Sequence, residues 1–354
     1  MLKYHPIRYR EYYKPIINSV YEELKSYNGE VPSGLMATTI FGQNIKPYIK
    51  NSIQSHYDVT LEALLNYYEE LFDAYTDYLM KGENIFHFKP ELIKMFQNSD
   101  VENAILSDIK LPYKSFYIHF GQNSGILDKK SNSLLDGAYV SYSIDSDLQE
   151  LFITLTFSSS NINYDKYLSV EEYLLLDNHF YFLLAFENDM TVEDAVDLAI
   201  SDEEKNIENE RRSYIEYNKW KSKLSSIVNL IINSLFYLSY EKNDVVKRYV
   251  DVVPESMHKK LKKSQTQREI KRNKSKIESL GFRKVHYCGD SIKKTTLEGH
   301  TEKEVSTHWR RGHWRSQPYG KNNKKRKLIW IKPTIVRPDK GSPDIKHIYE
   351  VEDD

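Results

Sequence analysis

The stretch from Leu151 to Phe157 reads LFITLTF and decides how the middle of the chain folds. Its leucine, isoleucine and phenylalanine side chains at 151, 153, 155 and 157 share one face, and the threonines at 154 and 156 take the other. This alternation predicts a β-strand with one buried face. Three further aromatic and β-branched runs are separated by Gly, Asn, Asp and Ser, namely residues 115–120, 138–144 and 180–186. Together they predict an antiparallel sheet in which 180–186, apolar on both faces, is a central strand.

Helices are predicted on both sides of these strands in the sequence. From Leu61 to Leu79 the apolar residues recur every three or four positions, as on one face of a helix, and Thr60 is placed to cap it. Thr191 and Asp194 have the spacing of a second helix start. A long helix from about Glu203 to Tyr240 is expected to brace the sheet. The predicted fold class is α+β: a helical N-terminal part, a central antiparallel sheet braced by a long helix, and a small basic β-rich C-terminal module.

Charge is unevenly distributed along the 354 residues, although the net charge is only −1. Residues 1–246 carry 22 Lys and Arg against 37 Asp and Glu, which gives −15, and residues 247–340 carry 27 against 9, which gives +18. The last fourteen residues add −4. A basic excess concentrated in one segment is typical of a protein that meets a polyanion, most often nucleic acid. The alternative is a solvated basic surface that neutralises the acidic part of the same chain.

Composition divides the chain into four segments. Residues 1–240 are expected to form a helical and sheet body that recognises a peptide or another target, 241–280 a basic linker or exposed helix, 281–340 a basic β-rich module and 341–354 an acidic tail. No apolar run is long enough to cross a membrane, the first residues lack a secretory signal, and a single cysteine, Cys288, excludes an internal disulfide. We therefore expect a soluble protein of a reducing cytosol.

The stretch HWRRGHWR at residues 308–315 is the most unusual in the chain, because it holds two of the four tryptophans, three arginines and two histidines. Arginine makes planar contacts to phosphate, and tryptophan and histidine offer faces on which unpaired bases stack. The predicted nucleic-acid-binding residues continue into the basic turn that follows: Arg310, Arg311, His313, Trp314, Arg315, Tyr319, Lys324, Lys325 and Arg326. The alternative is a small β-domain whose tryptophans are core and whose arginines stack on them.

The same stretch contains residues for a catalytic alternative. His308 and His313 could serve as general acid and base of a metal-independent ribonuclease, with Arg311 stabilising the charged intermediate. Their separation of five places the two rings on opposite faces of a regular strand, which disfavours this hypothesis. No paired ligand spacing of a zinc site, nucleotide-binding glycine motif or serine-hydrolase elbow occurs. The sequence therefore predicts no cofactor and no metal site, and a binding protein rather than an enzyme.

The residues RRGHW at 310–314, followed by Tyr319 and Gly320, a basic run, Trp330 and Pro333, resemble the C-terminal signature of the type V-A anti-CRISPR family that acts on effector messenger RNA. Two weaker similarities lie in the same order, at LPYKSFYIHF from residue 111 and at TVEDAVDLA from residue 191. Together they cover residues 105–200 and 300–337, and the first hundred residues match only in helical character.

The resemblance implies a protein carried by phages or plasmids and active in the cytoplasm of the bacterial host. Such a protein binds the N-terminal polypeptide of a CRISPR effector nuclease during translation and promotes destruction of its mRNA. The expected partners are the nascent polypeptide, which belongs to the type V-A effector or to another protein, the mRNA or ribosome, and host ribonucleases where the chain does not itself cut RNA. No membrane is involved. A third hypothesis is a DNA-binding accessory protein of a mobile element, which predicts salt-sensitive duplex binding.

Overall fold

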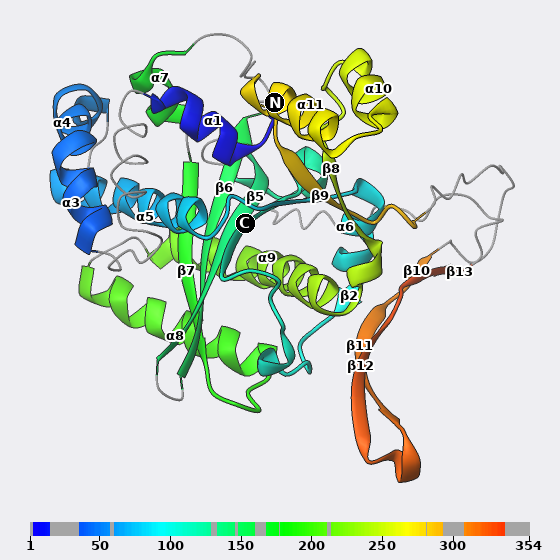
Figure 1. The fold of residues 1–354 in the computed structure, drawn as a ribbon. Helices are drawn as coiled ribbons and strands as arrows, with labels where there is room; N and C mark the ends of the chain where they lie inside the picture. Colours follow the sequence, from blue (N-terminus) through cyan, green and yellow to red (C-terminus); the bar gives the residue numbers. More distant parts are fainter. Residues whose placement is uncertain are drawn as a thin grey trace, which may run out of the picture. The chain divides into compact units, whose positions relative to one another are not determined.

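The computed structural model describes residues 3–14, 35–56, 60–128, 133–145, 148–159, 168–176, 178–210, 214–280, 282–292 and 308–336. The chain folds into two compact units that alternate along the sequence (Figure 1). The first, which we call the sheet unit, contains Met1–Pro90, Leu111–Glu187 and Asn243–Asp290. The second, the ribbon unit, contains Glu91–Lys110, Asn188–Lys242 and Ser291–Asp354.

The sheet unit is built on a mixed sheet with the strand order β7-β6-β5-β3-β1-β9-β8, and β4 pairs with β5 beside this path. The strands are β1 Ile85–Phe88, β3 Ser115–His119, β4 Leu127–Asp128, β5 Ser133–Asp145, β6 Leu148–Ser159, β7 Asn178–Phe186, β8 Val245–Tyr249 and β9 Lys284–Cys288. Strand β1 pairs in parallel with both β3 and β9, and the other neighbours are antiparallel. Three strands in the middle of the sheet therefore run in one direction.

The α+β class and the four predicted strands are confirmed, but the sheet differs from the prediction in two ways. It is mixed rather than antiparallel, because β1 and β9 enter it as parallel strands from distant parts of the sequence. Strand β7 lies at an edge of the described sheet rather than at its centre. Its residues are alternately buried and half-buried over the second half of the strand, as expected where only one face is covered.

The helices of the sheet unit include α5, which carries the predicted apolar stripe. They are α1 His5–Tyr12, α3 Leu35–Asn44, α4 Lys46–Tyr48, α5 Leu61–Met80, α7 Val170–Leu176, α10 Glu255–Lys263 and α11 Gln267–Ser279, with short turns η1 Ile49–Ile53, η2 Gln54–His56 and η4 Gly121–Ser124. The Thr60 side chain accepts a hydrogen bond from the Ala63 amide at 3.2 Å, which confirms the predicted cap. Tyr75 and Tyr78 of α5 contact the ring of Tyr139 on β5. Within this unit, α5 is therefore a helix that packs on the sheet.

A buried ion pair ties α1 to β5. Arg8 donates through Nη2 to Asp136 Oδ2 at 3.1 Å, and both side chains are 3% exposed. The Tyr117 hydroxyl donates to the same oxygen at 3.0 Å, and Nδ1 of His119 lies 3.6 Å from the other one. Burial alone would raise the pKa of Asp136, but Arg8, His119, His5 and the Tyr117 hydrogen bond together outweigh it and hold that pKa below its usual value.

The ribbon unit combines two long helices with short strands. Its elements are α6 Pro90–Gln97, β2 Ser99–Asp100, η3 Leu106–Asp108, α8 Val192–Glu210, α9 Tyr214–Tyr240, β10 His308–Arg310, β11 Gly312–Tyr319, η6 Lys321–Asn323, β12 Lys325–Ile331 and β13 Thr334–Val336. At the start of α8 the Thr191 hydroxyl donates to Asp194 Oδ2 at 2.6 Å and accepts from the Asp194 amide at 3.1 Å, which confirms the predicted helix start. The long helix predicted to brace the sheet corresponds to α8 and α9 of this second unit.

The segments expected from composition do not coincide with the two units. Residues 281–340 are divided, because β9 lies in the mixed sheet while β11 and β12 lie in the ribbon unit. Residues 241–280 supply the turn η5 (Lys242–Asp244), strand β8 and the exposed basic helices α10 and α11. The predicted acidic tail, 341–354, lies outside the described residues. Charge composition follows what is exposed, whereas sheet pairing follows buried apolar strands, so a charge boundary need not be a fold boundary. Within the described residues no helix is both long and apolar enough to span a membrane.

Candidate nucleic-acid interface

Strands β11 and β12 form a two-stranded antiparallel ribbon that carries most of the predicted binding residues. Its register runs from His313 opposite Ile331 to Tyr319 opposite Lys325. Gly320 and Asn322 at the tip have φ angles of 78° and 59°. Glycine and asparagine tolerate this left-handed backbone best, so the sequence SQPYGKNNKKRK forms the predicted basic turn.

The two faces of the ribbon have different chemistry. Trp314 pairs with Trp330 on one face, and both are buried, with exposed fractions of 8% and 7%. On the opposite face His313, Arg315 and Tyr319 are exposed. This is the alternation of a strand with one covered side. It separates the side chains that hold the ribbon in place from those that can meet a ligand.

Aromatic packing and hydrogen bonds anchor the buried face. The rings of Trp314 and Trp330 stack with 5.9 Å between centroids and 14° between planes. Trp314 Nε1 donates to Asn233 Oδ1 of α9 at 2.9 Å, and Trp330 Nε1 donates to Ser99 Oγ at 3.1 Å. Asn233 is 0% exposed and also donates through Nδ2 to the carbonyl oxygens of Phe96 and Ser99. These contacts therefore anchor the ribbon to α6, β2 and α9 of its own unit.

Gly312 lets the first residues of β11 approach β2 closely. Its amide donates to the carbonyl oxygen of Asn98 at 2.8 Å, and it lies opposite Ser99 in a parallel pairing. A Cβ atom at this position would lie 2.6 Å from Pro333 Cδ and 2.7 Å from Ile331 O and Ser99 Oγ. Because real Cβ contacts are not that short, any larger residue would push the ribbon away from its support.

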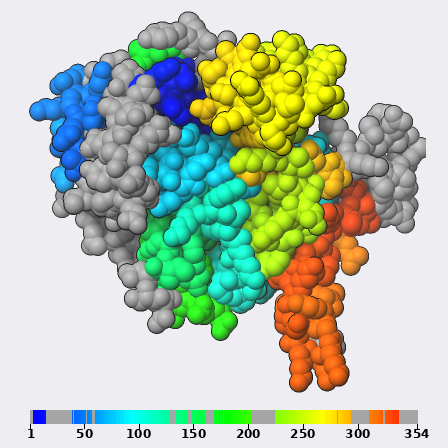
Figure 2. All heavy atoms as spheres, viewed as in Figure 1, coloured from blue at the N-terminus to red at the C-terminus, as the bar shows by residue number. Residues whose placement is uncertain are grey.

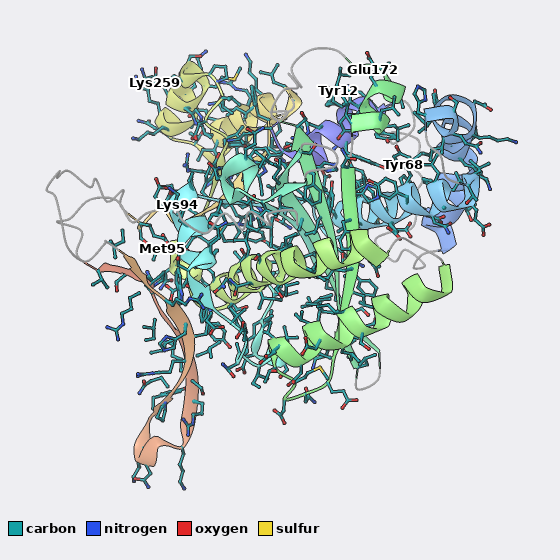
Figure 3. The ribbon with its side chains drawn as sticks, turned by 180° about the vertical axis from the view of Figure 1, so that it is seen from behind. Tyr12, Tyr68, Lys94, Met95, Glu172 and Lys259 are labelled. Carbon is teal, nitrogen blue, oxygen red and sulfur yellow. The ribbon has the colours of Figure 1, made fainter. Side chains whose placement is uncertain are left out.

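The exposed surface of the ribbon and its flanks is cationic. Residues 308–336 contain nine Lys and Arg and no Asp or Glu. All nine are exposed: Arg310, Arg311, Arg315, Lys321, Lys324, Lys325, Arg326, Lys327 and Lys332. In the part of the chain that the structure describes, none of them forms a salt bridge. Figures 2 and 3 show the ribbon's atoms at the surface and its side chains projecting from both strands. Unneutralised cations in this arrangement attract phosphate groups.

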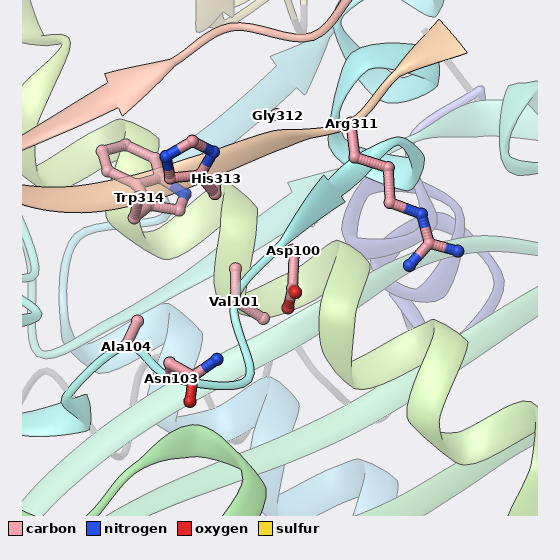
Figure 4. A pocket seen from close by; sticks show the side chains of 8 residues that line it. All are labelled: Asp100, Val101, Asn103, Ala104, Arg311, Gly312, His313 and Trp314. Atoms are coloured by element: carbon pink, nitrogen blue, oxygen red, sulfur yellow. The ribbon is translucent and has the colours of Figure 1, made fainter. Parts of the chain in front are cut away.

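A hollow of about 330 Å³ lies where β11 meets β2 (Figure 4). It is lined by Asp100, Val101, Asn103, Ala104, Arg311, Gly312, His313 and Trp314. Asp100 lies opposite His313 in the strand register, and its Oδ1 accepts a hydrogen bond from the Glu102 amide at 2.9 Å. The hollow thus places amide, carboxylate, guanidinium and imidazole groups together beside the cationic ribbon.

The comparisons with known proteins identify the family. A family model described as the anti-CRISPR type V subtype A2 family matches residues 86–338, which is more than half of the chain. The chain belongs to this family. The match includes both strands of the ribbon and all residues of the hollow, and the function of the family is anti-CRISPR activity.

A solved structure is also similar to this anti-CRISPR chain. It is described as the crystal structure of AcrVA2, with 13% sequence identity and a TM-score of 0.45, and the alignment covers 92% of this chain and 97% of that one. Comparison with curated protein sequences gives no match.

Not every predicted site residue in this family member is available to a ligand. Trp314 is stacked and hydrogen-bonded in the core, so the prediction that it offers a face for bases does not fit its place, and we remove it from the set. The other eight predicted residues are exposed. For the ribonuclease hypothesis, His313 and Arg311 line the hollow, while His308 belongs to β10 and its side chain lies outside the described residues. No group of three or more His, Cys, Asp or Glu side chains that could hold a metal ion occurs among the described residues.

Several residues of the interface could not be found by sequence reasoning. Asp100 at the end of β2 and Asn103 in the turn after it line the hollow from more than two hundred positions before β11, and Asn233 supports Trp314 from α9. None of them stands in a recognisable motif. Lys321 and Lys327 belong to the same basic run as the predicted lysines, so that run is the sequence feature from which they could have been included.

Proposed function

We propose that this anti-CRISPR protein is an adaptor that recognises a nascent target polypeptide and promotes degradation of the mRNA being translated, with the β11–β12 ribbon contacting RNA of the message or the ribosome. The observation that carries the RNA contact is the row of exposed cations on a firmly anchored ribbon that has no carboxylate of its own. The acidic balance of residues 1–246, at −15, supports a separate role for the rest of the chain in choosing the target.

The physical argument favours RNA contact through the phosphate backbone. Arg315 donates to Gln317, a neutral neighbour on the same face, and so keeps its charge available. Tyr319 is 47% exposed beside these cations and offers an aromatic face to an unpaired base. A cationic surface with one exposed aromatic binds single strands with little sequence preference, which suits a protein whose specificity comes from a peptide.

Co-expression with a reporter tests the adaptor function. The reporter mRNA would carry an N-terminal leader from the CRISPR effector, and the matched control would carry the same residues in scrambled order. We expect the leader-bearing mRNA to fall several-fold while the scrambled one stays level, with mRNA measured by quantitative PCR. Equal levels of the two messages would contradict peptide-guided decay.

Removing cations from the ribbon should weaken RNA binding. With Arg310, Arg311 and Arg315 replaced by Ala, the dependence of binding on salt should fall by about 0.7 for each single-strand phosphate contact that is lost. The measurement is fluorescence anisotropy on single-stranded RNA and on duplex DNA at several salt concentrations. A control with Lys46, Lys50 and Lys81 replaced by Ala removes the same charge from exposed positions of the sheet unit. Equal binding by both variants would mean that the three arginines do not contact RNA, and preference for duplex DNA would favour the DNA-binding alternative.

A further inference from the structure

A second cationic surface lies in the sheet unit, on the helical hairpin of α10 and α11. Residues 255–279 contain nine Lys and Arg against three Glu. An open groove of about 510 Å³ runs along the hairpin. Four cations line it: Lys260 and Lys263 from α10, and Arg272 and Lys276 from α11. Figure 2 shows the atoms of both helices, in yellow, at the surface of the molecule.

Apolar contacts fix which side of the hairpin faces outward. Ile277 is 1% exposed in the core of the sheet unit, and Met257 and Leu261 pack against the same core. At the far side Asn273 Nδ2 donates to Ser264 Oγ at 2.8 Å, which joins the two helices along the groove. The two helices are therefore fixed by apolar packing on one side and by this hydrogen bond on the other, and the cations of the groove point toward solvent.

The carboxylates of the hairpin do not neutralise the groove. Glu269, the carboxylate that lines it, forms a capping box: its Oε2 accepts from the Gln265 and Thr266 amides at 3.1 and 3.3 Å. These backbone hydrogen bonds lower the pKa of Glu269. Glu255 is paired with Lys259 at 2.9 Å, and Glu278 accepts from the Tyr249 hydroxyl. The groove is lined by four cations and by one carboxylate that is already hydrogen-bonded to the backbone, so the net charge of its lining is +3.

The spacing of the cations on α11 destabilises that helix. Arg268, Arg272 and Lys276 follow one another at intervals of four, so they lie on one face of α11 and repel each other. A Glu at position 272 would have turned both repulsive pairs into attractive ones. A like-charged stripe on a short polar helix favours a polyanionic partner over a purely structural role.

The lining of the groove decides which polyanion fits. It contains only charged and polar residues, with neither an aromatic nor an aliphatic side chain. Tight protein partners usually insert aromatic or apolar anchors, and bases are usually held by stacking, so the groove suits neither an acidic peptide nor a nucleobase. Lysine and arginine with amide and hydroxyl donors suit a chain of phosphates.

We propose that the groove between α10 and α11 binds the phosphodiester backbone of nucleic acid, without sequence preference, as a second contact site that is distinct from the ribbon. The site resides in the sheet unit, so its existence does not depend on the ribbon binding RNA. A nucleic acid that engages both surfaces of one chain gains avidity, because each contact raises the effective concentration for the other.

The experiment compares two variants of equal charge in the full chain. The groove variant replaces Lys260, Lys263, Arg272 and Lys276 with Gln, and the control variant replaces Lys259, Lys262, Lys271 and Lys274 with Gln. Fluorescence anisotropy is measured on a 30-nucleotide single-stranded RNA, an RNA duplex and a DNA duplex over a range of salt. We expect the groove variant to bind at least one probe ten or more times more weakly, with a smaller salt dependence, and the control variant to stay within about threefold.

The outcomes separate this site from the ribbon. A loss in the groove variant together with unchanged binding by the Arg310, Arg311 and Arg315 variant would support the groove and count against the ribbon. Equal binding by the groove and control variants would overturn the proposal. Lysine acetylation of the unmodified chain gives a second measurement: nucleic acid should protect Lys260, Lys263 and Lys276 at least threefold more than Lys259 and Lys262. Equal protection would also overturn it. The probe that binds most tightly decides between RNA and DNA.

Discussion

Replacing Trp314 with Ala is expected to destabilise the ribbon unit by about 3–5 kcal/mol, the usual cost of removing a large aromatic side chain from a core. The indole is 8% exposed, stacks on Trp330 and contacts Phe236 and Tyr240 of α9. Its loss also removes the donor to Asn233 Oδ1, which leaves a buried acceptor without that bond. The free energy of unfolding should therefore fall by more than the cavity alone would explain.

Arg315, the next residue along β11, is the matched control because its side chain lies on the exposed face. Replacing it with Ala should change the free energy of unfolding by no more than about 0.5 kcal/mol. Urea unfolding followed by tryptophan fluorescence is selective, since residues 220, 309, 314 and 330, the four tryptophans, all lie in segments of the ribbon unit. Similar losses in both variants would mean that the two faces of the ribbon do not differ in role.

The sequence predicts the parts of this fold that depend on local patterns. The alternation at 151–157 and the apolar stripe after Thr60 each describe residues close in the chain, and both elements form as expected. The parallel pairing of β1 with β3 on one side and with β9 on the other joins segments up to two hundred positions apart. No local pattern encodes that pairing, because a short buried strand has the same apolar sequence pattern in a parallel and in an antiparallel sheet.

In the candidate interface, too, the features that depend on local sequence were predictable and those that depend on distant residues were not. Charge and turn chemistry are local, so the cations around the ribbon tip were predicted from the sequence and are exposed in the structure. Whether a tryptophan in such a strand is core or surface depends on what covers it. Trp314 is covered by residues of α9, which lie about eighty positions earlier, and the sequence alone left both possibilities open.

Lowering the pH from 7 to 5 is expected to destabilise the sheet unit by several kcal/mol, through three histidines whose pKa is lowered by burial. Burial lowers the pKa of His119 and of His286 to about 4, and lowers that of His87 to about 2. In the unfolded chain a histidine has a pKa of about 6.5. Between about pH 6.5 and 4 the unfolded state therefore binds protons that the folded state does not, and each histidine costs about 1.4 kcal/mol per pH unit. The total is comparable with the whole stability of a typical domain, about 5–15 kcal/mol.

Replacing His119 with Phe should reduce this pH dependence, because one of the three rings no longer titrates and His87 loses a neighbour that lowers its pKa. Phenylalanine preserves the ring that packs against Tyr4, and His119 Nδ1 has no hydrogen-bond partner among the described residues. The measurement is a series of urea-unfolding midpoints between pH 7 and 5, followed by near-ultraviolet circular dichroism of the buried tyrosines. In the unmodified chain the contribution of Asp136 falls only as the pH drops below about 4, because its pKa is lowered, and in the variant Arg8 and the Tyr117 hydroxyl still act to lower that pKa. An unchanged slope in the variant would show that His119 is protonated as easily in the folded sheet as in the unfolded chain, and that its burial carries no electrostatic cost.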